Sequence, residues 1–197
     1  MIIQTNFLKF LRITVDNSLF WKQHIDTIIP RLNKACYIIR RCKLYLSHAA
    51  LKMVYYAFFH SVMSYDLIFW GNSTNGRCVF KLQKKAIRII MGAKNNDSCR
   101  EFFILLKILP LSAQYIYSLL MFVVENRNLF LDNVDLYSIQ TRNSYNLYPP
   151  LCHLTKYQKG VHYAAIRVFS QLPTSIKSVA NGTKVFKKML KRFLMDN

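Results

Sequence analysis

Acidic residues are scarce in this chain. Its 197 residues include only 9 Asp and Glu against 28 Lys and Arg, which gives a formal net charge of +19 at pH 7. A surface this unbalanced repels itself, and a polyanion relieves the repulsion while releasing its own condensed counterions. A codon bias toward lysine would leave the shortage of acids unexplained. The charge therefore predicts nucleic acid as the first partner and an anionic membrane surface as the second.

Glycine and proline are also few, at 5 residues each. Hydrophobic residues make up 52% of the chain and charged residues 19%, so there is enough apolar material for a sizeable core. Few breakers among many Leu, Ile, Lys and Arg argue against a sandwich of short strands. We expect a mainly α fold, a helical bundle with a short N-terminal β-hairpin.

The five cysteines are an odd number, and no two of them have C-x-x-C spacing. Neither a disulfide framework nor a zinc site is indicated, and reduced thiols in the nucleus or cytoplasm are the simplest interpretation. The first residues do not have the pattern of a secretory signal peptide. Residues 108–124 carry no charge but contain Pro110, Ser112 and Gln114. We therefore expect a buried helix there rather than a membrane span, and a membrane is the less favoured partner.

Clustered carboxylates are missing as well. A two-metal nucleotidyl transferase or nuclease needs them, yet no two of the nine acids are adjacent, and only Asp132 and Asp135 are close. There is no glycine-rich phosphate loop and no G-x-S-x-G motif. Cys152 and His153 are neighbours, but nothing positions them as a dyad, and His60 has the surroundings of a core histidine. We predict no catalytic residue, no metal site and no cofactor in this chain.

Hydrophobic periodicity predicts most of the elements. Residues 6–16 are β-prone and predict a short strand or tight hairpin. A helix is expected over 21–45, where Pro30 should kink it or mark its true beginning. A second helix, capped by Ser47 and reaching residue 69, is apolar on nearly all sides, so we expect it at the centre of the core. A third helix is expected over 78–91, where Gly92 ends it, and a fourth runs from a cap at Asp97 or Ser98 to residue 106. Three more helices are expected over 112–126, over 161–171 and from 183 onward. Residues 127–158 are expected to form a long irregular connection between them.

Basic residues recur at helical spacing in two places. Lys81, Lys84, Lys85 and Arg88 are three or four residues apart and predict one continuous basic face on the helix over 78–91. This face suits a phosphate backbone, but a merely solvated face fits equally well. The helix that begins at Thr183 has a second basic face, which also suits a membrane surface or a partner's groove. Five aromatic residues suit either base stacking or, more commonly, the core: Tyr37, Tyr45, Tyr55, Phe58 and Trp70.

Several short motifs, taken in order, resemble one family. Residues 9–13 read Lys-Phe-Leu-Arg-Ile, and Asp16, Leu19, Trp21, His24 and Ile25 follow, close to the pattern K-F-L-G-I/V-x-x-D-x-x-L-x-W-x-x-H-I. The matches that follow in the same order are Ser64-Tyr65, Trp70-Gly71-Asn72-Ser73, Phe80 with residues 82–90, Asp97-Ser98-Cys99-Arg100 with Phe103, Leu109-Pro110-Leu111, Thr141-Arg142 and Leu172-Pro173. Nearly the whole chain thus resembles the part after the palm of LINE-type (non-LTR), jockey-like retrotransposon reverse transcriptases.

The resemblance implies three segments: 1–20 as the end of the palm with a primer-grip-like hairpin, 21–128 as a helical thumb-like domain, and 129–197 as a basic loop with C-terminal helices. It implies that the parent protein is an RNA-directed DNA polymerase whose aspartates and Mg²⁺ lie in a palm domain missing from this chain. The chain alone would then bind the template–primer duplex of RNA and DNA without catalysis, next to that palm domain. The residues that we expect to contact nucleic acid are Lys81, Lys84, Lys85 and Arg88 at phosphates, Lys9 and Arg12 near the primer, and Arg142 in the basic loop.

The chain also departs from the family pattern. Arg12 and Asp66 stand where the pattern has glycine, and residues 137–142 only partly keep the motif expected there. If the glycine at position 12 serves a tight turn, arginine should strain it. Two other functions stay open. One is a domesticated, non-catalytic helical module that binds nucleic acid or protein, and the other is a membrane-surface protein that uses its final helix.

Overall fold

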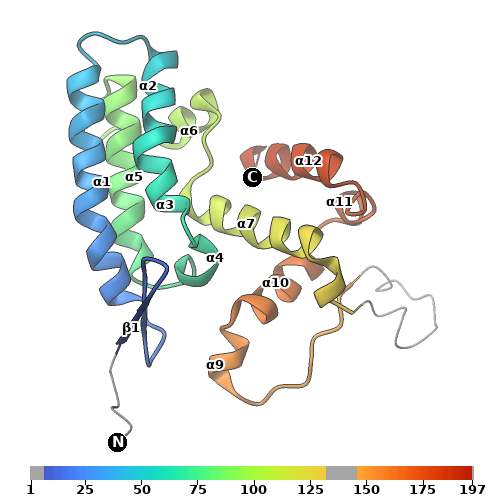
Figure 1. Cartoon of the computed structure of the whole chain (residues 1–197). Coiled ribbons are helices and arrows are strands. Elements are labelled where there is room, and N and C mark those ends of the chain that lie inside the picture. The colour runs from blue at the N-terminus through green and yellow to red at the C-terminus, as the bar shows by residue number, and fades with distance from the viewer. Residues whose placement is uncertain (1–6, 132–145, 197) are drawn as a thin grey trace, which may run out of the picture. The chain divides into compact units, whose positions relative to one another are not determined.

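The computed structural model describes residues 7–131 and 146–196 and has the expected mainly α fold with an N-terminal hairpin (Figure 1). The chain divides into two compact units between Ser112 and Ala113. The predicted segments 1–20, 21–128 and 129–197 stay predictions. No single helix in the described ranges is long and apolar enough to cross a membrane. Two consecutive helices, Arg100–Leu106 and Leu111–Glu125, reach the required length and apolar composition only when they are taken together, and the chain bends by 47° between them.

The hairpin consists of β1 (Phe7–Phe10) and β2 (Ile13–Asp16), with Phe10 opposite Ile13. The two connecting residues, Leu11 and Arg12, both have positive φ, at 45° and 68°. Positive φ at both positions is the requirement of a type I′ turn, whose twist matches that of the strands. The inner strand is β2, which buries Ile13 and Thr14, while every residue of β1 is exposed.

Arg12 therefore carries the strain that the sequence predicted. A left-handed conformation costs an L-residue roughly 1–2 kcal/mol relative to glycine. We expect Arg12→Gly to raise the free energy of unfolding by about 1 kcal/mol, measured by urea denaturation, because glycine relieves the strain but loses more chain entropy on folding. Arg12→Ala is the matched control, since it shortens the same side chain and keeps the strain. Equal stabilities of the Gly and Ala variants would contradict the prediction.

Three helical segments form the bundle of the first unit: α1 (Lys22–Cys42), α5 (Gly76–Met91) and the continuous run of α2 (His48–Val54), η1 (Tyr55–His60) and α3 (Ser61–Ser64). They lie side by side in Figure 1. Each helix buries one apolar stripe. The buried residues of α1 and α5 include Ile25, Ile28, Leu32, Cys36 and Ile39, and Val79, Ala86, Ile87 and Ile90.

Pro30 lies inside α1 and does not mark its beginning. A proline in a helix interior removes one hydrogen bond and costs about 3 kcal/mol. Here the proline is exposed, while Ile28 and Leu32 on either side of it are buried. Burial of these neighbours offsets the cost, so the helix runs through the proline.

The predicted helix over 47–69 differs from the structure in two ways. Ser47 caps it as expected, its Oγ accepting the Ala50 N–H at 3.4 Å, but the run ends at Ser64. Tyr65 is extended, Asp66 has φ of 50°, and a separate short helix, α4 (Leu67–Trp70), follows. Position 66 thus takes a conformation that favours glycine, which stops the helix.

The same run is not buried on all sides. Its buried stripe recurs every fourth residue, at Leu51, Tyr55, Phe59 and Met63, whereas Met53 is 68% exposed. An α-helix has 3.6 residues per turn, so side chains spaced four residues apart move gradually around the helix instead of staying on one face. The wider π-helical turn of η1 absorbs that drift and keeps the four side chains on one face. Overall apolarity did not show which face would be buried.

Gln83 joins three parts of the first unit. It is fully buried, and its Nε2 donates to Tyr55 Oη and to the carbonyl oxygen of Leu109, both at 3.0 Å. Its Oε1 accepts the N–H of Leu111 at 2.8 Å. The amide therefore holds the Leu109-Pro110-Leu111 segment against α5 and η1.

The end of α5 and the start of α6 (Arg100–Leu106) are close to expectation. Gly92 ends α5 with φ of 72°. Asp97 does not cap α6, because its carboxylate accepts the N–H of Lys94 at 2.8 Å and closes the preceding turn. Ser98 does not cap it either, because the N-cap residue is Cys99, which makes no side-chain cap hydrogen bond. Ser98 Oγ accepts the N–H of Arg100 at 3.5 Å from the position before the cap.

The second unit contains α7 (Leu111–Glu125) from Ala113 onward, η2 (Arg127–Leu129), α9 (Thr155–Gln158), α10 (Val161–Ser170), α11 (Thr174–Lys177) and α12 (Thr183–Asp196). The short helices α9 and α11 were not predicted, because four residues hold little more than one turn and show no periodicity. The ring of Phe130 stacks on His162 at 4.7 Å, and the guanidinium of Arg127 lies 5.3 Å from the Phe169 ring centroid.

Candidate nucleic-acid interface

The strongest feature of the first unit's surface is a row of cations along α5. Arg77, Lys81 and Lys85 are four residues apart and all exposed, and we call these three residues the basic stripe. The opposite side of the helix is buried in the bundle, so packing fixes the direction in which the stripe points. None of the three makes a hydrogen bond or an ion pair with the described residues. The sequence prediction contained Lys81 and Lys85 but missed Arg77, although the four-residue repeat could have found it.

Lys84 and Arg88, also predicted as phosphate contacts, have partners inside the protein. Arg88 donates from Nε and Nη2 to the carbonyl oxygen of Asp97, at 3.0 and 2.8 Å. Lys84 Nζ lies 4.9 Å from the Phe80 ring centroid. Both side chains are half-buried. The Arg88 bonds hold the loop after α5, whereas the Lys84 contact lies within α5, and the role of both residues at phosphates stays a prediction.

The cationic surface extends from α5 onto α1. Burial raises the pKa of the Cys36 thiol, and the charges of Lys85 and Arg40 oppose that shift. Both cations therefore lie near the same thiol, one on each helix. Arg40 is exposed like Lys85, so the two charges flank the contact between α1 and α5.

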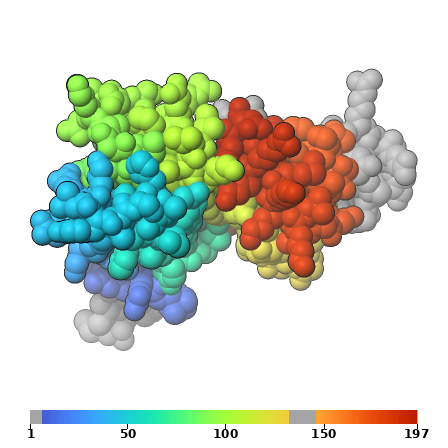
Figure 2. Space-filling model, turned by 90° about the horizontal axis from the view of Figure 1, so that it is seen from above, coloured from blue at the N-terminus to red at the C-terminus, as the bar shows by residue number. Residues whose placement is uncertain are grey.

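The structure separates the five candidate stacking residues. Tyr55 and Trp70 are fully buried, so their rings belong to the core. Tyr37, Tyr45 and Phe58 are exposed, and Tyr45 is 85% exposed in the connection between α1 and α2. Figure 2 looks down on this end of the bundle, where the light blue and cyan surface belongs to α1, the connection and α2. Only the three exposed rings are available to bases.

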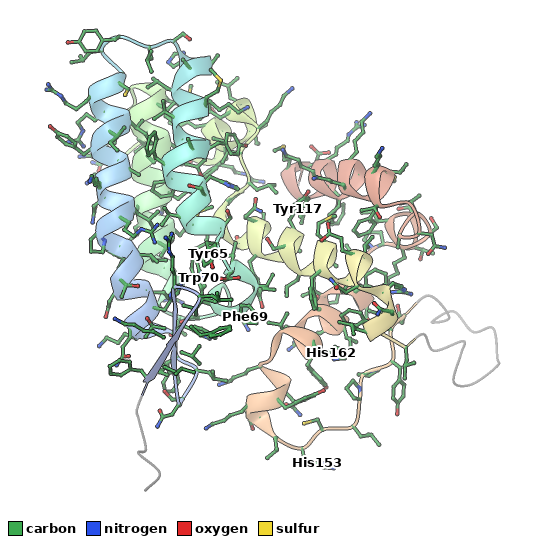
Figure 3. The ribbon with its side chains drawn as sticks, viewed as in Figure 1. Tyr65, Phe69, Trp70, Tyr117, His153 and His162 are labelled. Atoms are coloured by element: carbon green, nitrogen blue, oxygen red, sulfur yellow. The ribbon has the colours of Figure 1, made fainter. Side chains whose placement is uncertain are left out.

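Lys9 and Arg12 have different surroundings. Lys9 lies on the exposed strand β1 opposite Thr14. Arg12 lines a pocket of about 230 Å³ together with His24 and Arg31 of α1. Tyr65 fixes the hairpin turn beside the pocket, because its Oη donates to the carbonyl oxygen of Leu11 at 2.7 Å. Tyr65, Phe69 and Trp70 lie beside the hairpin in Figure 3.

His24 is the buried histidine of the fold, at 2% exposure, rather than His60. Its Nδ1 accepts the N–H of Thr14 at 3.5 Å, and its ring centroid lies 6.4 Å from that of Trp21 and 6.0 Å from that of Trp70. Burial lowers its pKa, Arg31 adds to that shift, and Asp66 opposes it. The ring is therefore neutral at pH 7. Its position in the family pattern was the only sequence signal for it.

The buried His24 should make stability depend on pH. Because its folded pKa lies below the unfolded value of about 6.5, the unfolded chain binds the proton more readily. The contribution is fully present above pH 6.5 and is lost as the pH falls through the folded pKa. We expect the free energy of unfolding to fall between pH 7 and pH 5 and the fall to be smaller in His24→Gln, measured by urea denaturation at each pH. Parallel curves for the two proteins would contradict this.

The remaining predictions concern the second unit. Arg142 lies outside the described residues and stays a prediction. In α12 the lysines are exposed, and Phe186 and Leu190 are buried. Cys152 Sγ donates to Leu154 O at 3.7 Å, so nothing pairs it with His153. The described residues contain no group of three or more His, Cys, Asp or Glu placed to hold a metal ion, and all five cysteines are free.

Comparisons of this chain with protein-family models, with curated proteins and with solved structures find no match. Its function therefore has to be argued from the charges, the pockets and the motif residues themselves.

Proposed function

We propose that this chain is the template–primer-binding part of a LINE-type reverse transcriptase and that it holds an RNA–DNA duplex by its phosphates. The basic stripe carries this proposal. Its three unpaired cations cover about 12 Å of helix axis, which is several phosphates of a strand with a rise of about 3.4 Å. The stripe belongs to a chain with a net charge of +19, so the long-range field favours the same ligand.

The backbone supports the resemblance to this family at two positions. Arg12 and Asp66 stand where the family pattern has glycine, and both have positive φ, at 68° and 50°. Glycine adopts such conformations without strain, whereas other residues rarely adopt them. A pattern that places glycine at these two positions fits the backbone of this chain.

Other motif residues hold turns in the first unit. Trp70 Nε1 donates to the carbonyl oxygen of Tyr65 at 3.1 Å. Ser73 Oγ and Asn75 Nδ2 donate to the carbonyl oxygen of Phe20, at 2.8 and 3.1 Å. These bonds join the start of α1 to the loop after α4. Trp70 and Ser73 belong to the motif and Asn75 follows it, so two of the motif residues hold turns of this fold.

The hairpin offers a surface for the palm domain of the parent protein. Phe10 and Leu11 are 63% and 68% exposed, and an apolar pocket of about 310 Å³ lies beside them, lined also by Trp21 and Phe69. An exposed apolar patch next to an unpaired strand edge is typical of a protein contact. We infer that the palm domain packs here and supplies the aspartates and Mg²⁺ of RNA-directed DNA polymerase, in the nucleus or cytoplasm, while this chain contributes no catalytic residue.

The same apolar patch also favours the second candidate, a domesticated helical module that binds another protein or nucleic acid. The two candidates differ in what happens when the patch stays uncovered. A module of its own is expected to be soluble and monomeric, whereas a piece of a polymerase is expected to associate through the hairpin.

Binding of the purified chain to a short, labelled RNA–DNA hybrid tests the proposal. The logarithm of the affinity should fall linearly with the logarithm of the salt concentration, by about 0.7–0.9 for each phosphate contact. Hybrids of different sequence should bind alike, because phosphate contacts carry no sequence information. An affinity that does not change with salt would refute the phosphate-binding role, and would leave the protein-binding module.

A further inference from the structure

We propose that the pocket between the hairpin turn, α1 and α3 is a binding site for a single phosphate group. Arg12, His24, Arg31 and Ser61 are among the residues that line it. This site deepens the proposed function, and it rests on that function only for the source of the phosphate. The pocket itself stands on its own geometry and charge.

The charges around the pocket call for an anion. Two arginines, Arg12 and Arg31, line it, and no lining residue in the described ranges is acidic. Neither arginine makes a hydrogen bond or an ion pair with the described residues. Guanidinium groups bind phosphate oxygens in pairs, with charge-assisted hydrogen bonds. Asp66, whose charge acts on His24, does not line the pocket, so a phosphate there would be the counter-charge that both arginines share.

His24 adds a donor to the same wall. Its Nδ1 accepts the N–H of Thr14, so the proton of the neutral ring is on Nε2. The residue is 2% exposed, and Nε2 makes no hydrogen bond with the described residues. The Nε2 atom is not fully buried, so this donor is open to the pocket that the residue lines. A phosphate oxygen in the pocket would provide the acceptor, whereas a cation would meet a ring that offers it no free lone pair.

The strained turn points to the same site. Arg12 keeps φ of 68° in a turn where glycine would fit without strain, and its side chain lines the pocket. Strained residues cluster at functional sites, where the side chain is needed despite the strain. The volume of about 230 Å³ also suffices, since one water molecule occupies about 30 Å³.

The first experiment titrates inorganic phosphate into the full chain and follows the imidazole ¹⁵N signals of His24, with chloride at equal ionic strength as the reference. We expect a saturable shift of the His24 signals. Arg31→Gln should weaken the phosphate affinity at least tenfold. Lys34→Gln is the matched control, because it removes one charge from an exposed residue of the same helix that does not line the pocket. An unshifted His24, or equal losses in the two variants, would overturn the site.

Arg12→Gly separates binding from folding. This variant is expected to be more stable than the parent, so a loss of phosphate affinity in it cannot come from unfolding. We expect its affinity to fall at least tenfold as well. Unchanged affinity in a folded Arg12→Gly protein would show that Arg12 is not part of the site.

The source of the phosphate is decided by competition. A nucleoside monophosphate and a 5′-phosphorylated oligonucleotide are each added to the phosphate-loaded chain, and an unphosphorylated oligonucleotide serves as the comparison. If the mononucleotide displaces the phosphate, the natural ligand of the pocket is a free nucleotide. If an oligonucleotide displaces it and the mononucleotide does not, the ligand is a nucleic-acid strand. Displacement by none of the three would mean that inorganic phosphate binds adventitiously. A chain that fails to bind duplex but still shows the His24 response would refute the proposed function and keep the pocket.

Discussion

Gln83→Met is expected to lower the free energy of unfolding by about 3 kcal/mol. Methionine fills nearly the same volume, so the loss comes from hydrogen bonds rather than from a cavity. Three groups would lose their partner: Tyr55 Oη, the carbonyl oxygen of Leu109 and the N–H of Leu111. Each buried polar group left without a partner costs about 1–3 kcal/mol, and partial relaxation keeps the sum near the lower end. Urea denaturation followed by circular dichroism measures it.

Tyr55→Phe is the control for this prediction. It removes only the bond between Tyr55 Oη and Gln83, and the amide keeps its other two partners. The expected loss is about 1 kcal/mol. If Gln83→Met were no more destabilising than Tyr55→Phe, the amide would not be what holds the Leu109-Pro110-Leu111 segment. Because Gln83 lies on α5 between Lys81 and Lys85, its loss should also disturb the basic stripe.

Neutralising the basic stripe should have the largest effect on binding. In the triple variant Arg77→Gln, Lys81→Gln and Lys85→Gln, three phosphate contacts disappear while the buried face of α5 is untouched. The slope of the logarithm of the affinity against the logarithm of the salt concentration should become shallower by roughly 2–3, since each phosphate contact contributes about 0.7–0.9. At low salt we expect the affinity for the RNA–DNA hybrid to fall about 100-fold, or roughly 1 kcal/mol per contact. Fluorescence anisotropy over a series of salt concentrations measures both quantities.

A second triple variant removes the same charge elsewhere. Lys187→Gln, Lys188→Gln and Lys191→Gln neutralise three exposed lysines of α12 and lower the net charge equally. If only the total charge of the protein matters, both variants will weaken binding alike, and the basic stripe will have no special role. A clearly larger loss in the α5 variant assigns the contacts to the stripe.

Local features of the fold were predictable from the sequence alone. The hairpin, the cap at Ser47 and the end of α5 at Gly92 depend on the residues themselves and on their immediate neighbours. The strain at Arg12 was expected from the family pattern, which has glycine at that position. Helix periodicity likewise predicted the extents of α1, α5, α7 and α10 to within a few residues. Propensity and backbone sterics act over a few residues, so a single sequence contains the information that decides them.

The tertiary structure alone decided which side chains face inward and which meet. The sequence could not show that Gln83 and His24 are buried, that Arg88 binds a loop carbonyl, or that Arg12, Arg31 and His24 line one pocket. Nor could it place the π-helical turn of η1 or the break at Asp66. These outcomes depend on what packs against each residue from distant parts of the chain, and polar groups are buried only where a partner from another element satisfies them. The net charge of the chain follows from its composition alone. Which cations remain free to bind a phosphate depends on how α5 packs in the bundle.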